Sequence, residues 1–284
     1  MSDFSAAAGA VSLAQWVFVF VGVALVAAWF FAPQLRTFRL RPARLPAWDA
    51  PLADTLLVVW VAVCAVFVGS LLAGSLTRQF ALESGTGWVS VLSVLGFQGA
   101  VIAALGLFAI YRRSLGRPLP PLGARPPASL TDGVLVGAAV FCAALPFVYG
   151  ASFASTKLMQ ALDLPVKLQD LAGFFTSATS PQLVVVLTVM GVLVAPLAEE
   201  LVFRAGLFRI SRRLLPRWAA LLLSSLAFAS LHGSAVHFVP LTVLGLFFAL
   251  GYERSGSLVV PVVAHGLFNL NSIMLLLAGV GGAP

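Results

Sequence analysis

Most of this sequence consists of apolar runs, each followed by a short polar connection. We place eight runs at Val11–Ala32, Thr55–Leu76, Trp88–Tyr111, Gly133–Phe153, Leu183–Arg209, Trp218–His232, His237–Tyr252 and Ser257–Ala278, the sixth and seventh being short. A bilayer requires about 20 residues of helix, and backbone groups inside it must be hydrogen-bonded within the protein. The sequence therefore predicts an all-α fold, a polytopic transmembrane helical bundle of about eight spans.

The amount and position of charge agree with this class. Charged residues make up 10% of the chain, against about 25% in soluble domains. The net charge of +7 does not indicate a nucleic-acid partner, because the basic residues fall mostly in three connections, a pattern that orients membrane proteins. These residues are Arg36, Arg39, Arg41 and Arg44, then Arg112, Arg113, Arg117 and Arg125, then Arg212, Arg213 and Arg217. With the three connections in the cytoplasm, both termini lie outside.

The chain divides into an N-terminal part, residues 1–182, with spans one to four and an interfacial segment, and a C-terminal transmembrane core, residues 183–284. The first run has no basic segment before it and no small-residue cleavage site after it, so we expect it to be retained. From Ser155 to Pro181 the mixed composition predicts short interfacial helices. Cys64 and Cys142 lie inside apolar runs and predict packing roles.

The segment from Glu199 to Arg204 carries three ionisable groups at the end of Leu183–Leu197, which has none. Placing an acidic side chain at the centre of a membrane helix is unfavourable by about 2.5–3.5 kcal/mol, so these glutamates are by default a functional hypothesis. Glu200 and Arg204 are four residues apart and share a helix face, which predicts an ion pair. Glu199 is rotated by about 100° from Glu200 and needs a partner on another helix.

The three histidines all follow the glutamates. His265 and Asn269 lie four residues apart on one face of the last run and can meet the same ligand. At about 1.5 Å per residue, His265 and Glu200 lie at similar depths. His232 ends the short sixth run, four residues after Phe228, so that run must tilt or start below the surface if the groups converge.

Each motif also has a purely structural interpretation. The glutamates can form a buried ion pair with Arg204 beside one neutral carboxylic acid. His265 with Asn269 can be a helix–helix hydrogen bond, and His232 can cap a helix end. His237, outside any spaced pattern, is predicted to be interfacial.

In combination and in this order, the motifs resemble the CPBP family of intramembrane proteases, which includes CAAX-processing endopeptidases of the Rce1 type and bacteriocin-processing proteins of the Abi type. The family pattern is matched by Glu199, Glu200, Arg204, Phe228, His232, His265 and Asn269. The resemblance covers roughly Leu183 to Leu277. It implies a multi-pass protein of a bacterial inner membrane that hydrolyses membrane-associated peptides, such as prenylated CAAX-like or leader peptides. The loop charges predict that its site opens to the cytoplasm.

The resemblance also implies roles for these residues. Glu199 with His232 is expected to activate a water as general base, and His265 with Asn269 to donate hydrogen bonds to the oxyanion. Glu200, Arg204 and Phe228 are expected to hold these groups in place.

Two alternatives remain open at this point. A catalytic zinc could be bound by Glu199, His232 and His265. However, the sequence lacks the compact His-Glu-x-x-His helix, and a zinc site of this kind would leave only Asn269 to bind the oxyanion. We therefore favour a mechanism without a cofactor. A non-proteolytic scaffold or a proton-coupled transporter would also keep carboxylates and histidines in a bundle. Asn269, which has no proton to relay, and the absence of paired repeats favour the protease.

Overall fold

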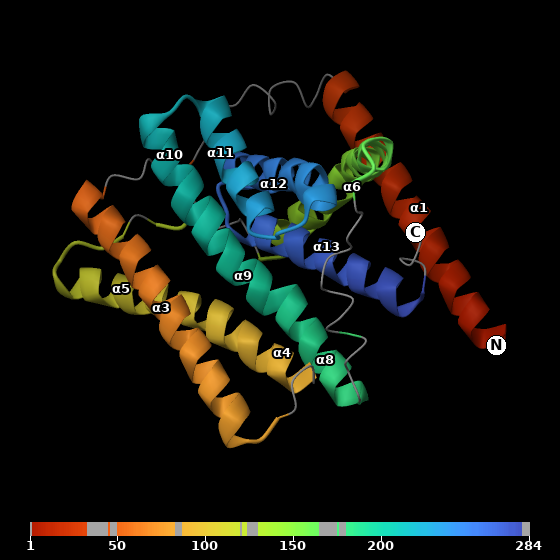
Figure 1. Cartoon of the computed structure of the whole chain (residues 1–284). Helices are drawn as coiled ribbons and strands as arrows, with labels where there is room; N and C mark the ends of the chain where they lie inside the picture. The colour runs from red at the N-terminus through yellow and green to blue at the C-terminus, as the bar shows by residue number, and fades with distance from the viewer. Residues whose placement is uncertain are drawn as a thin grey trace.

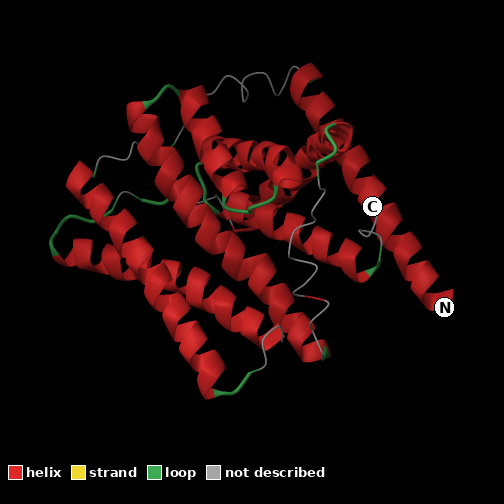
Figure 2. Ribbon diagram, in the orientation of Figure 1, coloured by secondary structure: helices red, strands yellow, loops and turns green. Residues whose placement is uncertain are grey.

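The computed structural model of the chain describes residues 2–32, 45, 50–82, 87–119, 121–123, 130–164, 175 and 180–279. All secondary structure in these ranges is helical (Figures 1 and 2), which confirms the predicted all-α fold. In chain order the elements are α1 (Ser2–Phe31), α3 (Leu52–Gln79), α4 (Gly87–Val94), η1 (Leu95–Gly99), α5 (Ala100–Ser114), α6 (Leu130–Ala161), α8 (Pro181–Val189), η2 (Met190–Val194), α9 (Ala195–Glu200), η3 (Leu201–Phe208), α10 (Arg209–Leu214), α11 (Arg217–Ser230), α12 (Ala235–Ser255) and α13 (Val259–Leu277). The three η elements are π-helical.

Among the described residues, seven helical runs of 19 to 34 residues are long and apolar enough to cross a membrane. Two of them are composite, since α4, η1 and α5 form Gly87–Ser114 and α8 to α10 form Pro181–Leu214. The short sixth run is confirmed as α11, an apolar helix of 14 residues. With α11, the described residues form eight helical runs, where about eight spans were predicted. α12 is longer than its predicted run, at 21 residues.

The composite helix Pro181–Leu214 crosses the middle of the molecule (Figure 1). On one side of it lies a hairpin formed by α3 and the helix from α4 to α5. This hairpin contacts the composite helix where α4 meets α8 and where η1 meets α9. On the other side α6 packs against α1, α12 and α13, and α11 packs against α12. The composite helix is thus positioned to receive side chains from both sides.

The core of the bundle lies where α6, α11, α12 and α13 meet η3. Its buried side chains include Leu145 of α6, Phe203 of η3, Phe228 of α11 and Phe248 of α12. Because lipid is as apolar as these side chains, the helices are held together by close packing and polar contacts more than by apolar burial. α6 connects the predicted N-terminal part to this core, and the boundary at residue 182 stays a prediction.

Polar contacts gather at the end of the bundle where α3 and α11 begin and α5, α10 and α12 end. They join Arg112 to Asp54, Arg209 to the Pro121 carbonyl, Arg213 to the Ala50 carbonyl, Arg217 to Glu253, and Tyr252 to the Leu122 carbonyl. The second and third basic connections therefore lie at one end of the molecule, as an orientation by positive charge requires. The first basic connection, with Arg36, Arg39, Arg41 and Arg44, lies outside the described residues, and so does Arg125.

The prediction of interfacial helices from Ser155 onward is wrong in its first part, because α6 continues without a break to Ala161. The Ser155 hydroxyl donates a 2.7 Å hydrogen bond to the Val236 carbonyl of α12, which holds this last part of α6 against the bundle. Residues 165–174 and 176–179 of the predicted interfacial segment lie outside the described residues.

Candidate active site

The two glutamates end α9, between the π-helical stretches η2 and η3. The sequence predicted one regular helix here and did not reveal either stretch. In a π-helix each N–H bonds to the carbonyl five residues earlier, and single-turn insertions of this kind are frequent at functional sites. Glu199 and Glu200 thus have π-helical backbone on both sides, and Arg204 lies within η3.

The predicted ion pair between Glu200 and Arg204 is confirmed. Arg204 Nη1 donates to Glu200 Oε1 at 2.8 Å, and both side chains are 0% exposed. Arg204 Nη2 also donates to the Gly245 carbonyl of α12 at 3.1 Å. The guanidinium carbon lies 4.7 Å from the Phe228 ring centroid and 5.3 Å from that of Phe248. A buried charge is stable only when it is paired and hydrogen-bonded, and here the rings supply cation–π contacts in addition.

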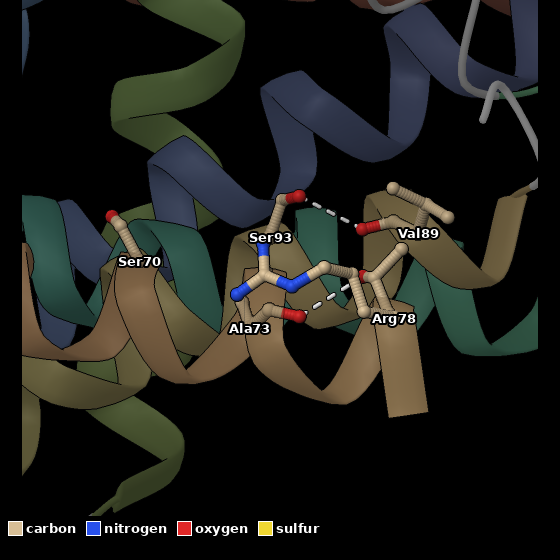
Figure 3. Close-up of a pocket in the computed structure, with 7 residues that line it drawn as sticks. Ser70, Ala73, Arg78, Val89 and Ser93 are labelled. Atoms are coloured by element: carbon tan, nitrogen blue, oxygen red, sulfur yellow. Dashed lines mark hydrogen bonds between the residues drawn. The ribbon is translucent and has the colours of Figure 1, made fainter. Parts of the chain in front are cut away.

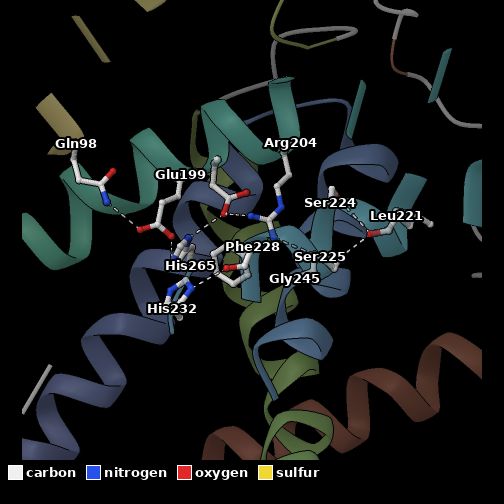
Figure 4. Close-up of polar contacts among 11 residues, drawn as sticks. Gln98, Glu199, Arg204, Leu221, Ser224, Ser225, Phe228, His232, Gly245 and His265 are labelled. Carbon is white, nitrogen blue, oxygen red and sulfur yellow. Dashed lines mark hydrogen bonds and ion pairs between the residues drawn. The ribbon is translucent and has the colours of Figure 1, made fainter. Parts of the chain in front are cut away.

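His265 extends this pair from α13. Its Nδ1 lies 2.9 Å from Glu200 Oε1 (Figure 4), and the side chain is 3% exposed. Because Glu200 already accepts from Arg204 as a carboxylate, it can only accept, so His265 Nδ1 is the donor. The imidazole stacks on Phe248 with centroids 4.9 Å apart. Its Nε2 is therefore left for chemistry. The predicted match in depth between His265 and Glu200 is confirmed by this contact.

Glu199 points away from the ion pair, toward partners on two other helices, as its position predicted. Its Oε1 accepts a 3.2 Å hydrogen bond from Gln98 Nε2 of η1, and its Oε2 lies 3.9 Å from His265 Nε2 (Figure 4). The Glu199 side chain is 19% exposed. Among the described residues, Oε2 has no hydrogen-bond partner. Glu199 is thus the glutamate of the pair whose side chain is partly exposed, although the Oε2 atom itself is buried.

Asn269 lies one turn after His265 and bonds to the backbone of η2. The Ala195 N–H donates to the Met190 carbonyl, five residues earlier. The next residue, Pro196, has no N–H with which to continue this pattern. The Gly191 carbonyl is therefore left without its backbone donor. Asn269 Nδ2 donates to this carbonyl at 2.8 Å. An asparagine amide carries two N–H groups, so the second one remains for a ligand.

Gly266 allows α13 to lie this close to η2. A Cβ at this position would lie 2.5 Å from the Val192 carbonyl oxygen, which is shorter than a normal contact. The glycine between His265 and Asn269 therefore sets the distance between the two helices that form the site.

His232 follows α11, and its Nδ1 lies 2.9 Å from the Phe228 carbonyl. Since a carbonyl only accepts, Nδ1 donates, and Nε2 of the neutral ring is an acceptor. The Phe228 ring contacts both imidazoles, with centroids 4.8 Å from His232 and 5.5 Å from His265. Phe228 thus separates the buried Arg204 from the two histidines and fixes their positions. His237, predicted to be interfacial, lies near the start of α12, with Nδ1 2.8 Å from the Ser234 hydroxyl.

The proposed zinc ligands do not fit a metal site in this arrangement. Within the part of the chain that the structure describes, no three His, Cys, Asp or Glu side chains gather closely enough to hold a metal ion. Glu199, His232 and His265 are therefore not pre-arranged as ligands of one ion.

Gln98, Gly191, Gly245 and Phe248 also contact the site, and sequence reasoning missed them. Gln98 left a signal, because it is the single amide side chain in the apolar run Trp88–Tyr111, where a polar group usually joins helices. Gly191 and Gly245 act through their backbone carbonyl groups, and Phe248 resembles any other buried aromatic residue. The sequence therefore gives no signal for these three residues.

A separate groove of about 330 Å³ lies between α3 and α4 (Figure 3). It is lined by Ser70, Ala73, Gly74, Thr77, Arg78, Val89 and Ser93. The Thr77 and Ser93 hydroxyls bond to carbonyls of their own helices. The groove contains none of the predicted site residues.

Comparisons with known proteins point to one family. Residues 181–271 match the family described as "Type II CAAX prenyl endopeptidase Rce1-like". An "Uncharacterized protein" of Mycoplasma capricolum is 30% identical over 130 residues, 44% of this chain and 35% of that protein. An "Uncharacterized 24.3 kDa protein" of Escherichia coli is 31% identical over 166 residues, 57% of this chain and 70% of that protein.

A third relative, the "Putative membrane peptidase YdiL" of Bacillus subtilis, is 29% identical over 99 residues, 35% of this chain and 41% of that protein. The chain thus spans well under half of the Mycoplasma and Bacillus proteins. No solved structure matches the chain. The family match includes every predicted site residue from Glu199 to Asn269, whereas Gln98 lies outside it.

Proposed function

The chain belongs to the CPBP family of Rce1-like intramembrane proteases, and from this premise we propose that it hydrolyses peptide bonds of membrane-associated peptides with a water activated by Glu199. The observation that carries the proposal is the different state of the two glutamates. Glu200 is fully buried and held by Arg204 and His265. Glu199 is partly exposed, and its Oε2, which has no hydrogen-bond partner in the described chain, lies 3.9 Å from His265 Nε2. Glu200 Oε2 also lacks a partner among the described residues, but the Glu200 side chain is 0% exposed.

In the first step Glu199 Oε2 takes a proton from a water, whose oxygen attacks the carbonyl carbon of the scissile peptide. The acceptor nitrogen that His232 presents supports a second contact to this water. A positioned general base of this kind contributes about 10²- to 10⁴-fold in rate. Glu200 cannot replace Glu199, because its Oε1 already accepts from Arg204 and His265 and its side chain is 0% exposed.

The oxyanion that forms receives hydrogen bonds from α13. Asn269 offers the N–H that it does not use on Gly191. His265 donates from Nε2 in the form that carries a proton on both ring nitrogens. Each preorganised donor is worth about 10²- to 10³-fold in kcat.

When the tetrahedral intermediate collapses, the C–N bond breaks and the proton held by Glu199 passes to the leaving amine nitrogen. The water is then divided between the new carboxyl group and the new amine, and Glu199 returns to its starting form. These steps use only residues of this chain. A zinc mechanism would need Glu199, His232 and His265 to move together.

The substrate class and the location are part of the proposal. The site lies in a helix within the apolar bundle, which favours peptides that are themselves membrane-borne, such as prenylated CAAX-like C-termini or leader peptides. Glu199 lies ten residues before Arg209, at about 15 Å along the helix from the basic end of the bundle. With basic residues in the cytoplasm of a bacterial inner membrane, the site opens to that side.

The test is cleavage of a library of membrane-borne peptides by the purified protein in proteoliposomes, with products identified by mass spectrometry. We expect discrete peptide products, and the same rate after exhaustive chelation. Metal analysis should find well below one equivalent of zinc. Stoichiometric zinc whose removal abolishes cleavage would decide for the metal mechanism, and a pure, folded protein that cleaves no member of the library would count against the protease.

A further inference from the structure

Gln98 is the side chain that brings the N-terminal hairpin into the site. It lies in η1, outside the residues that match the family. Its Nε2 donates to Glu199 Oε1 at 3.2 Å (Figure 4). η1 also packs against α9, the helix that ends with Glu199. The contact is therefore part of an interface between two helices and does not depend on an extended side chain alone.

The packing of the hairpin explains why Gln98 faces α9. A Cβ at Gly96 would lie 2.5 Å from the Gly69 carbonyl oxygen, so η1 and α3 approach each other closely at this glycine. Two residues farther along η1 the side chain points to roughly the opposite side of the helix, so Gln98 faces away from α3. Because the Gly96 side of η1 packs against α3, the Gln98 amide on the other side points toward Glu199.

The hydrogen bond makes the two oxygens of Glu199 different. A terminal carboxylate rotates about a broad, two-fold torsion and exchanges its oxygens unless a partner holds one of them. Gln98 occupies Oε1, and the oxygen that remains, Oε2, lies 3.9 Å from His265 Nε2. A neutral amide can provide this contact without adding charge to the site.

We propose that Gln98 is a positioning residue of the hydrolytic reaction, which holds Glu199 through Oε1 so that Oε2 faces the reacting water and His265. The inference rests on the proposed function, since it assigns Gln98 a role through the base named there. It adds a residue from the N-terminal hairpin to a site whose other members lie between residues 181 and 271.

The test compares two variants that remove the donor in different ways. Gln98→Met keeps the length of the side chain and removes the N–H, while Gln98→Asn keeps the amide and withdraws it by one methylene. A hydrogen bond to a charged group is worth about tenfold, so kcat should fall about tenfold in both variants with KM within about twofold. Ser93→Ala, which removes a hydroxyl bonded within α4, is the matched control and should keep the wild-type kcat.

The two variants separate positioning from packing. If Gln98 only fills space, Gln98→Met should keep the wild-type kcat. If only the polarity of Gln98 matters, Gln98→Asn should keep the wild-type kcat. Either result overturns the proposal. A fall in kcat accompanied by an equal loss of thermal stability, or shared by Ser93→Ala, also overturns it. If the wild type cleaves and Glu199→Gln does not, the proposed function stands even when the Gln98 variants are fully active. If Glu199→Gln is active, the proposed function fails first.

Discussion

At the scale of the residue, Glu199 and Glu200 show how one chemical group acquires two roles from its surroundings. Glu200 is enclosed by Arg204 and His265 and is inaccessible to solvent. Glu199, one residue earlier, faces η1 and α13, and its side chain is 19% exposed. The rotation of about 100° between helix neighbours is sufficient to produce this difference.

Removing the charge of Glu199 should stop the reaction and leave the fold intact. Glu199→Gln keeps the size of the side chain and still accepts from Gln98, so the melting temperature should stay within about 2 °C of the wild type. Cleavage should fall by at least about 10²-fold, the typical loss of a general base. The measurement is a cleavage assay beside a thermal melt in detergent, with Asp163→Asn at an exposed position after α6 as control. Wild-type activity in Glu199→Gln would refute the assignment of the base.

Removing Arg204 should instead damage the fold. Arg204→Ala leaves Glu200 as a buried carboxylate without its main partner, and breaking a buried pair in this way lowers the free energy of unfolding by about 3–5 kcal/mol. The double variant Glu200→Gln/Arg204→Ala should be less destabilised than Arg204→Ala, because the unpaired charge is gone. Denaturant titration in detergent measures both, with the exposed Arg78→Ala as control, expected within about 0.5 kcal/mol of wild type. Equal stability of Arg204→Ala and Arg78→Ala would rule out the ion pair as a stabilising contact.

At the scale of the element, prolines free backbone carbonyls that side chains from other helices then bind. Pro196 leaves the Gly191 carbonyl to Asn269, and Pro240 removes the N–H that would bond to Val236, whose carbonyl accepts from Ser155. A freed carbonyl inside an apolar bundle needs a donor, so these contacts fix how the helices meet. The proline positions predict where carbonyls are freed. They do not predict the donors, which come from helices far apart in the sequence.

The approach of α13 to η2 depends on Gly266 and can be tested there. In Gly266→Ala the new methyl group meets the Val192 carbonyl, so α13 must move away from η2 and weaken the bond from Asn269 to Gly191. We expect a loss of about 1–3 kcal/mol in stability, as for other overpacked positions, together with loss of cleavage. Gly150→Ala in α6, whose added Cβ would have no atom within 4 Å, is the matched control and should be as stable as wild type or more so. Equal behaviour of the two variants would show that the close approach is not needed.

At the scale of the whole molecule, the sequence predicted the helices well and their meeting points only in part. Apolar runs of bilayer length predicted the bundle, and the spacing of Glu200 and Arg204 predicted their ion pair, because both follow from local periodicity. The contact between Gln98 and Glu199 joins residues 101 positions apart, and no local pattern encodes such a pairing. The π-helical stretches, two of which flank α9, also went unpredicted.

The orientation of the bundle in the membrane is the prediction that belongs to this scale. The basic residues at the ends of α5 and α10 lie at one end of the bundle, and positive charge orients such an end to the cytoplasm. The experiment starts from a protein with Cys64→Ala and Cys142→Ala, to which Leu215→Cys is added. Leu215 is exposed and lies between α10 and α11. The new thiol should react with an impermeant thiol reagent only after the cells are opened.

Phe80→Cys, an exposed position at the other end of α3, should react in intact cells and serves as the matched control. The reverse pattern would place the basic end outside and contradict a site that opens to the cytoplasm. It would leave the chemistry of Glu199 untouched, because the hydrogen bonds of the site do not depend on which face of the membrane they meet. The substrate peptides would then have to be sought among those that reach the site from the outer face.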